Sequence, residues 1–218
     1  MSVEEISCDP PLKPAEAGGW DVELSPAEIA KPIHFAALFG RVARTEVEIG
    51  SGSGVFLSAE AARRPDVNFF AMEQDRDQVK RSKEKWRRRG LTNIRIVRVD
   101  ALYFMEEYFP PESVDAFIIL FSDPWPKKRH HKRRLFQPRL LEAIRKSLKP
   151  GGTLHIKTDV SEYYTVIVRL FESADFLEKL ADQRLDEQPL EDDIVTNFQR
   201  KALEKGHPIH RLLYRRRA

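Results

Sequence analysis

Five short segments rich in β-branched and aromatic residues alternate along this chain with segments of helical spacing. The strand-like segments span residues 46–50, 67–73, 93–101, 114–121 and 153–159. The fourth, VDAFIILF, is apolar almost throughout, which is typical of a strand buried on both faces of a parallel sheet. Parallel strands need long crossover connections, usually helices, so the alternation predicts an α/β fold. We expect a mostly parallel central sheet with helices on both faces.

Proline and glycine mark the ends of the expected helices. Residues 54–64 and 76–89 are predicted to be helical, because Pro65 ends the first segment and Gly90 the second. Residues 140–148 also have helical spacing and precede the sequence KPGG.

The N-terminal part of the chain has little periodicity. Ser25 has the features of an N-cap, with Pro26 at the first helical position and Glu28 completing a capping box, so a helix is expected to begin there. We expect residues 1–24 to form a flexible leader and residues 25–218 to form a single domain.

Composition excludes several classes of protein. Hydrophobic residues make up 41% of the 218 residues and charged residues 33%, which argues against wholesale disorder. Cys8 is the only cysteine and the N-terminus lacks a secretory pattern, so we expect no internal disulfide and a reducing, cytoplasmic location. No apolar run approaches the ~20 residues of a membrane span, and no cluster of Cys and His predicts a metal site.

Positive charge is concentrated in three stretches, although the net charge is only +3. Residues 80–89 carry seven cations, residues 127–134 carry six and residues 211–218 carry four. One such stretch is typical of a solvated surface or a frayed end. Three of them on an otherwise acidic chain indicate a polyanionic partner, either RNA or DNA.

Polar or glycine residues follow each of the five expected strands. In chain order they are Glu48, Gly50, Gly52 and Gly54, then Glu73, then Asp100 and Ala101, then Asp123, and finally Asp159. Ligands of parallel α/β sheets bind outside the carboxyl ends of the strands. Because these ends meet at one edge, we expect the residues that follow them to surround a single site.

The acidic residues suit S-adenosylmethionine better than a dinucleotide. The loop has the spacing GxGxG rather than the GxGxxG of pyrophosphate-binding loops, although glycines also serve plain tight turns. Glu73 is placed to accept both hydroxyls of a ribose, or else is a surface acid. Asp100 is placed to accept from an adenine amino group, or else caps a helix. With Glu48, these carboxylates fit a neutral ribose and a cationic sulfonium.

The chain also resembles the bacterial tRNA (guanine-N7-)-methyltransferases, over about residues 35–214. The matching motifs, in family order, are VEIGSGSGVFL, FFAMEQD, NIRIVRVDA, FSDPWPKKRHHKRRL, LKPGGTLHIKTD and, more loosely, TNFQRKALEKG. The motif DPWPKKRHHKRR is highly specific, whereas many methyltransferases share the glycine loop. The resemblance implies a Rossmann-like class I methyltransferase fold and methylation of N7 of the variable-loop guanosine of tRNA, as a monomer or homodimer.

The resemblance also implies roles for individual residues. Asp123 would be the catalytic acid, where cofactor and base meet. The cofactor would be held by Glu48, Gly50, Gly52, Gly54, Glu73, Asp100, Ala101 and Asp123. The tRNA would be bound by Lys127, Asp159, Thr196, Asn197 and Gln199.

Asp123 and the cations after it suit different parts of this reaction. Guanine N7 has a lone pair and no proton to lose, so a nearby carboxylate would stabilise the cationic product rather than remove a proton. A turn before Pro124 is the alternative role for Asp123. The basic residues 127–134 would face phosphates, and we expect Trp125 to cover the core rather than stack on RNA.

Gln199 departs from the family pattern, which reads Thr-x-x-Glu at this place. A glutamine accepts with one oxygen and also donates, whereas a glutamate only accepts. We expect Gln199 to contact the target guanine, so that Gln199→Glu maintains or raises activity. The departure leaves two alternatives open: a methyltransferase acting on another RNA or a small molecule, and a catalytically silent RNA-binding relative.

Overall fold

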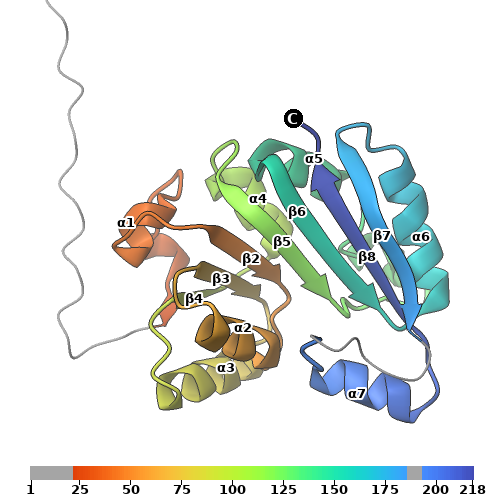
Figure 1. Ribbon diagram of the computed structural model, residues 1–218, viewed down its shortest axis with the longest axis horizontal. Coiled ribbons are helices and arrows are strands. Elements are labelled where there is room, and N and C mark those ends of the chain that lie inside the picture. The colour runs from red at the N-terminus through yellow and green to blue at the C-terminus, as the bar shows by residue number, and fades with distance from the viewer. Residues whose placement is uncertain (1–21, 186–192) are drawn as a thin grey trace, which may run out of the picture.

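A computed structural model describes residues 22–185 and 193–218. The strands in these ranges form one sheet of eight, in the order β1-β4-β3-β2-β5-β6-β8-β7 (Figure 1). Their bounds are β1 Glu23–Leu24, β2 Thr45–Ile49, β3 Asn68–Glu73, β4 Ile94–Arg98, β5 Val114–Leu120, β6 Leu148–Thr158, β7 Leu177–Leu185 and β8 Ile209–Arg216. Strand β8 pairs antiparallel with β6 and β7, and the other pairs are parallel. The predicted mostly parallel sheet is confirmed.

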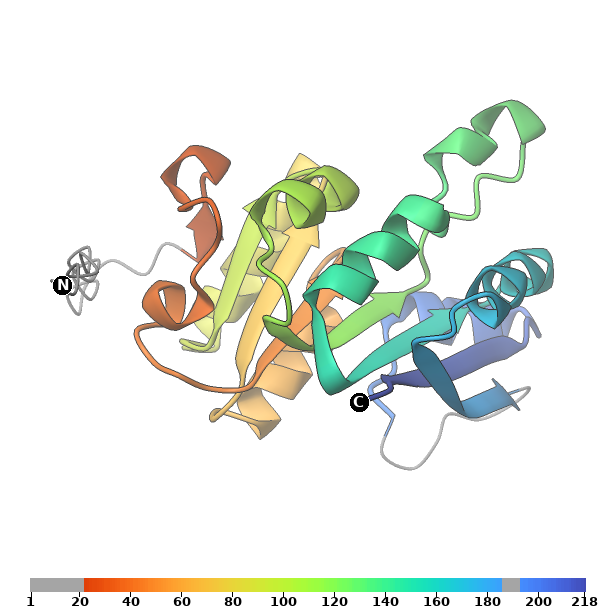
Figure 2. The same cartoon turned by 90° about the horizontal axis from the view of Figure 1, so that it is seen from above.

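Helices cover both faces of the sheet (Figures 1 and 2). The α-helices are α1 Phe35–Phe39, α2 Val55–Arg63, α3 Arg76–Arg88, α4 Ala101–Tyr108, α5 Pro138–Ser147, α6 Ser161–Glu172 and α7 Asn197–Glu204, with 3₁₀ turns η1 Pro26–Glu28 and η2 Lys128–Arg133. Helices α4, α5 and α6 pack on one face in a large apolar core, and α2 and α3 pack on the other face in a smaller one.

Strand β3 shows how one sequence serves both cores. Phe70 and Met72 point into the larger core, whereas Phe69 and Ala71 point into the smaller one. Successive side chains of a strand point to opposite faces, so a strand between two helical layers must be apolar at every position. All four side chains are at most 1% exposed.

The helix expected at Ser25 is confirmed, with Ser25 as N-cap, Pro26 at the first position and Glu28 completing the capping box. It is the short 3₁₀ turn η1, because the chain turns extended again at Ile29. The fold also begins before residue 25: Val22 is buried, and Glu23–Leu24 pairs with β4. The remaining part of the expected leader, residues 1–21, lies outside the described residues.

The order of the strands places a crevice beside β2. The chain runs from β2 outwards through β3 and β4, and then crosses back to place β5 on the other side of β2. Such a reversal is a topological switch point, where the loops after the two central strands separate and leave room for a ligand. Within the described ranges, no helix has the length and apolar character needed to cross a bilayer.

Protonation of His155 is expected to destabilise the fold. Burial in β6 is the main cause that lowers its pKa from 6.5 to about 4, with Glu46 opposing the shift and Arg211 adding to it. Between these two pH values the unfolded chain binds a proton that the folded chain does not, so the free energy of unfolding falls as the pH is lowered.

When the pH is lowered from 7 to 4.5, we predict that the free energy of unfolding falls less in His155→Gln than in the wild type. The two decreases should differ by roughly 2 kcal/mol. Urea unfolding at both pH values measures this difference. Parallel pH profiles for the two proteins would contradict the buried, neutral state of His155.

Candidate active site

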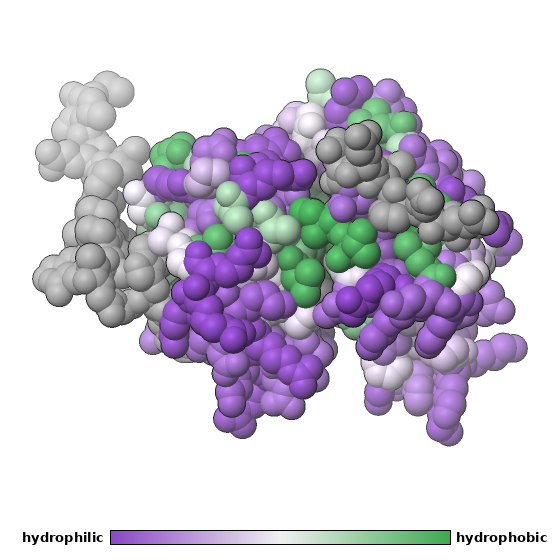
Figure 3. Space-filling model, turned by 60° about the horizontal axis from the view of Figure 1, so that its bottom comes forward, coloured by the Kyte–Doolittle hydropathy of each residue, from purple (hydrophilic) through white to green (hydrophobic). Residues whose placement is uncertain are grey.

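A cavity of about 960 Å³ opens at the carboxyl ends of the central strands. Nine of the residues expected from the sequence line it: Glu48, Gly50, Gly52, Glu73, Asp100, Ala101, Asp123, Thr196 and Asn197. They come from loops after β2, β3, β4 and β5 and from the start of α7. Figure 3 turns the molecule toward this end and shows apolar surface near its centre, flanked by hydrophilic surface on both sides.

The glycine loop has two separate structural requirements. Gly50 and Gly52 line the cavity with φ of 76° and 51°, a backbone conformation that glycine adopts without a steric penalty. Gly54 does not line the cavity. A Cβ on Gly54 would lie 2.6 Å from Trp86, whose indole Nε1 donates to the Gly54 carbonyl at 2.9 Å. Gly54 therefore allows α2 and α3 to approach closely.

Glu73 joins the glycine loop to the start of α3. Its Oε2 accepts from Gly52 N at 2.8 Å, and its Oε1 accepts from Gln74 N at 2.8 Å and from Asp75 N at 2.9 Å. A carboxylate has about four lone-pair sites, so Glu73 keeps accepting capacity on the cavity side. The carboxylate is held in place by backbone donors rather than by a cation.

Asp100 caps a helix, which is one of the two roles that its position suggested. Its Oδ1 caps α4 by accepting from Tyr103 N at 2.9 Å, and its Oδ2 accepts from Gln74 Nε2 at 2.7 Å. The residue nevertheless lines the cavity together with Ala101, the first residue of α4. Gln74 thus links the ends of β3 and β4 at the rim.

Glu48 brings an unsatisfied carboxylate to the floor of the cavity. Its side chain is 2% exposed, and its Oε2 has no hydrogen-bond partner among the described residues. Burial, and then the charge of Glu73, raise the pKa of Glu48 well above its usual 4.5. Ser51 Oγ, also at the cavity, is likewise without a partner in the described part of the chain. Buried polar atoms without partners are costly, so this floor is suited to a ligand that supplies positive charge and donors.

Asp123 lies in a strained loop after β5. Phe121 and Trp125, two residues to either side of it, have φ of 54° and 43°. Such conformations cost non-glycine residues on the order of 1–3 kcal/mol each and concentrate at functional sites. Asp123 Oδ1 accepts from Trp125 N at 2.9 Å, which fixes an exposed carboxylate at the cavity rim. The turn contact therefore holds Asp123 at the cavity.

The basic segment after Asp123 projects from the body of the molecule as an arm that includes η2 (Figure 2). Arg134 anchors its base: Nε donates to the Pro124 carbonyl at 2.7 Å, and the guanidinium lies 5.2 Å from the Tyr163 ring. Arg133 lies 5.0 Å from the ring of Trp125. The expectation that Trp125 covers the core is wrong, because the Trp125 ring lines the cavity and stacks with the Arg133 guanidinium.

The first turn of α7 forms another wall of the cavity. Thr196 caps the helix, with its Oγ1 accepting from Gln199 N at 3.2 Å. Phe198 lines the cavity, is 60% exposed and lies nearly parallel to Phe121, with ring centroids 6.4 Å apart. An exposed aromatic ring at a cavity offers a flat apolar surface to a planar ligand.

Four expected site residues lie away from the cavity lining: Gly54, Lys127, Asp159 and Gln199. Lys127 is an exposed residue at the start of the arm, and Asp159 directly follows β6. Gln199 is fully buried, with its amide engaged by Lys157 and Asp193. Gln199 therefore does not lie where it could contact a base directly. The preceding residues, Thr196–Phe198, line the cavity, whereas the Gln199 side chain is buried away from it.

Several cavity residues were not identified from the sequence. Phe121 and Phe198 had a usable signal, since each lies within a quoted motif and carries a large aromatic side chain. Gln74 follows Glu73 directly and carried the same positional signal. Lys157 and Asp193, which hold Gln199 but do not line the cavity, had no signal, because nothing in their local sequence indicates that they meet.

Comparison with known proteins agrees with this geometry. A family model described as "Putative methyltransferase" matches residues 43–212. A tRNA (guanine-N(7)-)-methyltransferase of Halorhodospira halophila is 37% identical over 85% of this chain and 80% of its own length. One from Burkholderia vietnamiensis is 40% identical over 84% of this chain and 71% of its own.

Solved structures support the fold. The 16S rRNA methyltransferase KamB has a TM-score of 0.64 at 14% identity, covering 87% of this chain and 98% of its own. A SAM-dependent methyltransferase from Aquifex aeolicus has a TM-score of 0.54 at 16% identity, covering 82% and 85%. Together with the sequence relatives, these likenesses show that the fold is the Rossmann-like class I methyltransferase fold and that the chain belongs to the tRNA (guanine-N7-)-methyltransferase family.

Proposed function

We propose that this protein transfers a methyl group from S-adenosylmethionine to N7 of the variable-loop guanosine of tRNA. The observation that carries the proposal is the position of Asp123, on the rim of a carboxylate-lined cavity and at the base of a cationic arm. Relatives that are 36–40% identical bear the name of this activity.

The hydrogen-bonding groups of the cavity suit S-adenosylmethionine. Glu48 Oε2 and Ser51 Oγ, which have no partner among the described residues, suit the charged and polar groups of the methionine part. Glu73 keeps acceptor capacity for ribose hydroxyls, and Asp100 lies at the rim where an adenine amino group would be accepted. When bound, the sulfonium supplies an activated methyl group.

Asp123 would act by electrostatics rather than by taking a proton. Guanine N7 attacks with its own lone pair, and the ring gains positive charge as the bond forms. A carboxylate held at the rim by Trp125 N stabilises that charge without reorganising at the moment of reaction. Phe198 and Phe121 offer apolar faces against which the flat base would be aligned.

The arm would bind phosphates next to the site. The arm projects beyond the body of the molecule (Figure 2), and its cations that are not engaged at its base are exposed. Lys and Arg that neutralise phosphates release counterions, so such binding weakens as salt is raised. We include Lys127 and Asp159 in the tRNA-facing surface because Lys127 begins the arm and Asp159 directly follows β6.

We predict that Asp123→Asn lowers the rate of methyl transfer to tRNA by about 10²–10³-fold at saturating cofactor, since it removes the charge nearest the reacting ring. Single-turnover transfer from labelled cofactor to bulk tRNA, followed by mapping of the modified base, measures it. The control Asp66→Asn, which removes an exposed carboxylate away from the cavity, should leave the rate unchanged.

Two results would count against the proposed function. Label in the wild-type reaction that maps away from guanosine N7, or that appears equally on free guanosine, would point to a different substrate. An Asp123→Asn variant as fast as the wild type would remove Asp123 from the reaction.

We also predict that neutralising three exposed arm cations, Lys128, Arg129 and Lys132, flattens the salt dependence of tRNA binding. Each lost phosphate contact should reduce the slope of log K against log salt by about 0.9 for a duplex. Arg133 and Arg134 are left in place because they hold Trp125 and Pro124. Titrations at several salt concentrations give the slope.

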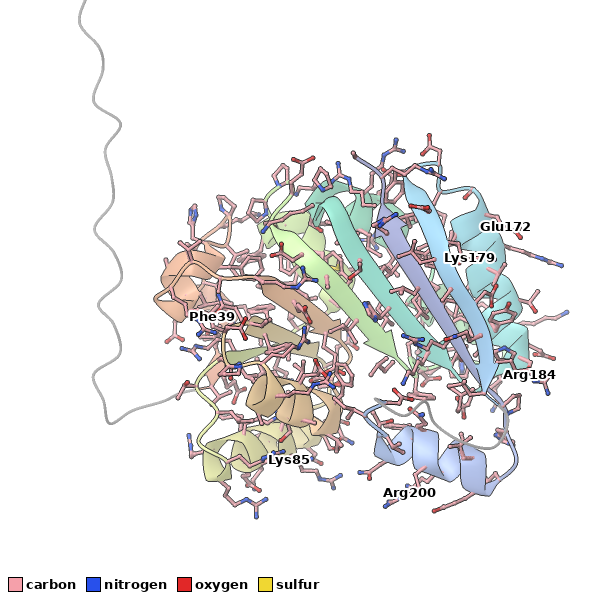
Figure 4. All side chains as sticks on the ribbon, viewed as in Figure 1. Phe39, Lys85, Glu172, Lys179, Arg184 and Arg200 are labelled. Atoms are coloured by element: carbon pink, nitrogen blue, oxygen red, sulfur yellow. The ribbon has the colours of Figure 1, made fainter. Side chains whose placement is uncertain are left out.

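The matched control replaces three cations far from the cavity, Arg145, Arg169 and Lys179. Figure 4 shows Lys179 on β7, toward the end of the sheet opposite α7. The control triple should leave the slope near that of the wild type. Equal slopes for both triples would show that the arm does not contact phosphates.

A further inference from the structure

Three polar side chains form a closed group behind the cavity wall that α7 provides. The Lys157 ammonium pairs with Asp193 and also donates to Gln199 Oε1 at 3.2 Å. Gln199 Nε2 in turn donates to Asp193 Oδ2 at 2.7 Å. The side chains of Lys157 and Asp193 are 8% and 10% exposed, and Gln199 is fully buried. Each member therefore contacts both of the others, away from water.

The group contains one cation, one anion and one neutral amide. A buried ion pair is tolerated when its charges balance and its remaining polar atoms are satisfied. Burial lowers the pKa of Lys157, and the bond to Asp193 opposes that shift. Among the described residues, Asp193 thus supplies the negative charge that pairs with Lys157.

Glutamine suits position 199 because it both accepts and donates. Its carbonyl oxygen faces the Lys157 ammonium, and its amide nitrogen faces the Asp193 carboxylate. A glutamate could satisfy the first contact but only accepts, so it would set a second carboxylate against Asp193 at about the same distance. Two buried carboxylates sharing one lysine leave an unbalanced charge.

The group ties the cavity wall to the sheet. Gln199 lies in the first turn of α7, next to the cavity residues Asn197 and Phe198. Lys157 lies in β6, two residues before Asp159. The contacts between them join the start of α7 to the carboxyl end of β6, whereas Arg200 on the outer side of α7 points away from the sheet (Figure 4).

We propose that Lys157, Asp193 and Gln199 are positioning residues that fix the segment Thr196–Phe198 at the cavity, and that glutamine is required at 199 because Asp193 already holds the balancing charge. The inference rests on the proposed function for its effect on tRNA. It replaces the expectation that Gln199→Glu maintains or raises activity.

The test uses the full chain with Gln199→Glu, Asp193→Asn and the double variant Asp193→Asn/Gln199→Glu. The double variant restores one carboxylate and one amide in exchanged places. Lys201→Gln is the control, because it changes the charge of α7 by the same amount at an exposed residue. Amide hydrogen exchange across residues 193–204 and the KM for tRNA are measured, with cofactor affinity as a check on the cavity floor.

Gln199→Glu should speed exchange in this segment and raise the KM for tRNA, each about tenfold, with cofactor affinity unchanged. The double variant should return both values to within about threefold of the wild type, and Lys201→Gln should leave exchange unchanged. Exchange in Gln199→Glu that matches the wild type, or a double variant worse than both single variants, would overturn the positioning role. The exchange result does not depend on methylation, so it stands apart from failure of the proposed function.

Discussion

Parallel pairing of β2 with both β3 and β5 is the constraint on which the rest of the structure depends. It makes the three strands end at the same edge, so the loops that follow them are neighbours in space although they are far apart in sequence. Glu48, Glu73 and Asp123 are brought together by this pairing alone. The helices on both faces then exclude water from the floor of the cavity, which gives a carboxylate there its unusual environment.

The cavity combines groups that are costly in isolation. Glu48 has a buried carboxylate oxygen that is without a partner among the described residues, which reduces stability. The two aromatic residues with positive φ near Asp123 reduce it further. The large apolar core behind the sheet offsets such costs and keeps the loops in place. A binding site whose groups are held in an unfavourable state before the ligand arrives gains more from a ligand of complementary charge than a relaxed site does.

Much of this arrangement followed from the sequence because it depends on local pattern. Strand periodicity, the glycine loop and the acids at the strand ends are all short-range signals, and the structure places most of these residues at one cavity. The helix at Ser25 formed with the expected cap but is only one 3₁₀ turn long, because a cap does not extend a helix where the following residues turn extended. Trp125 and Gln199 were misplaced for another reason. The position of Trp125 depends on its contact with Arg133, and that of Gln199 on its contacts with Lys157 and Asp193. These are tertiary contacts, which sequence spacing does not reveal.

The most direct test of the account is the proton linkage of cofactor binding at Glu48. The calorimetric affinity for S-adenosylmethionine would be measured across pH in the wild type and in Glu48→Gln. If the carboxylate is protonated in the free cavity and ionised beside a cationic ligand, binding releases a proton. Affinity in the wild type should then rise with pH through the raised pKa of Glu48, and this dependence should vanish in the variant. The same pH dependence in both proteins would contradict a buried carboxylate floor that is completed by the cofactor.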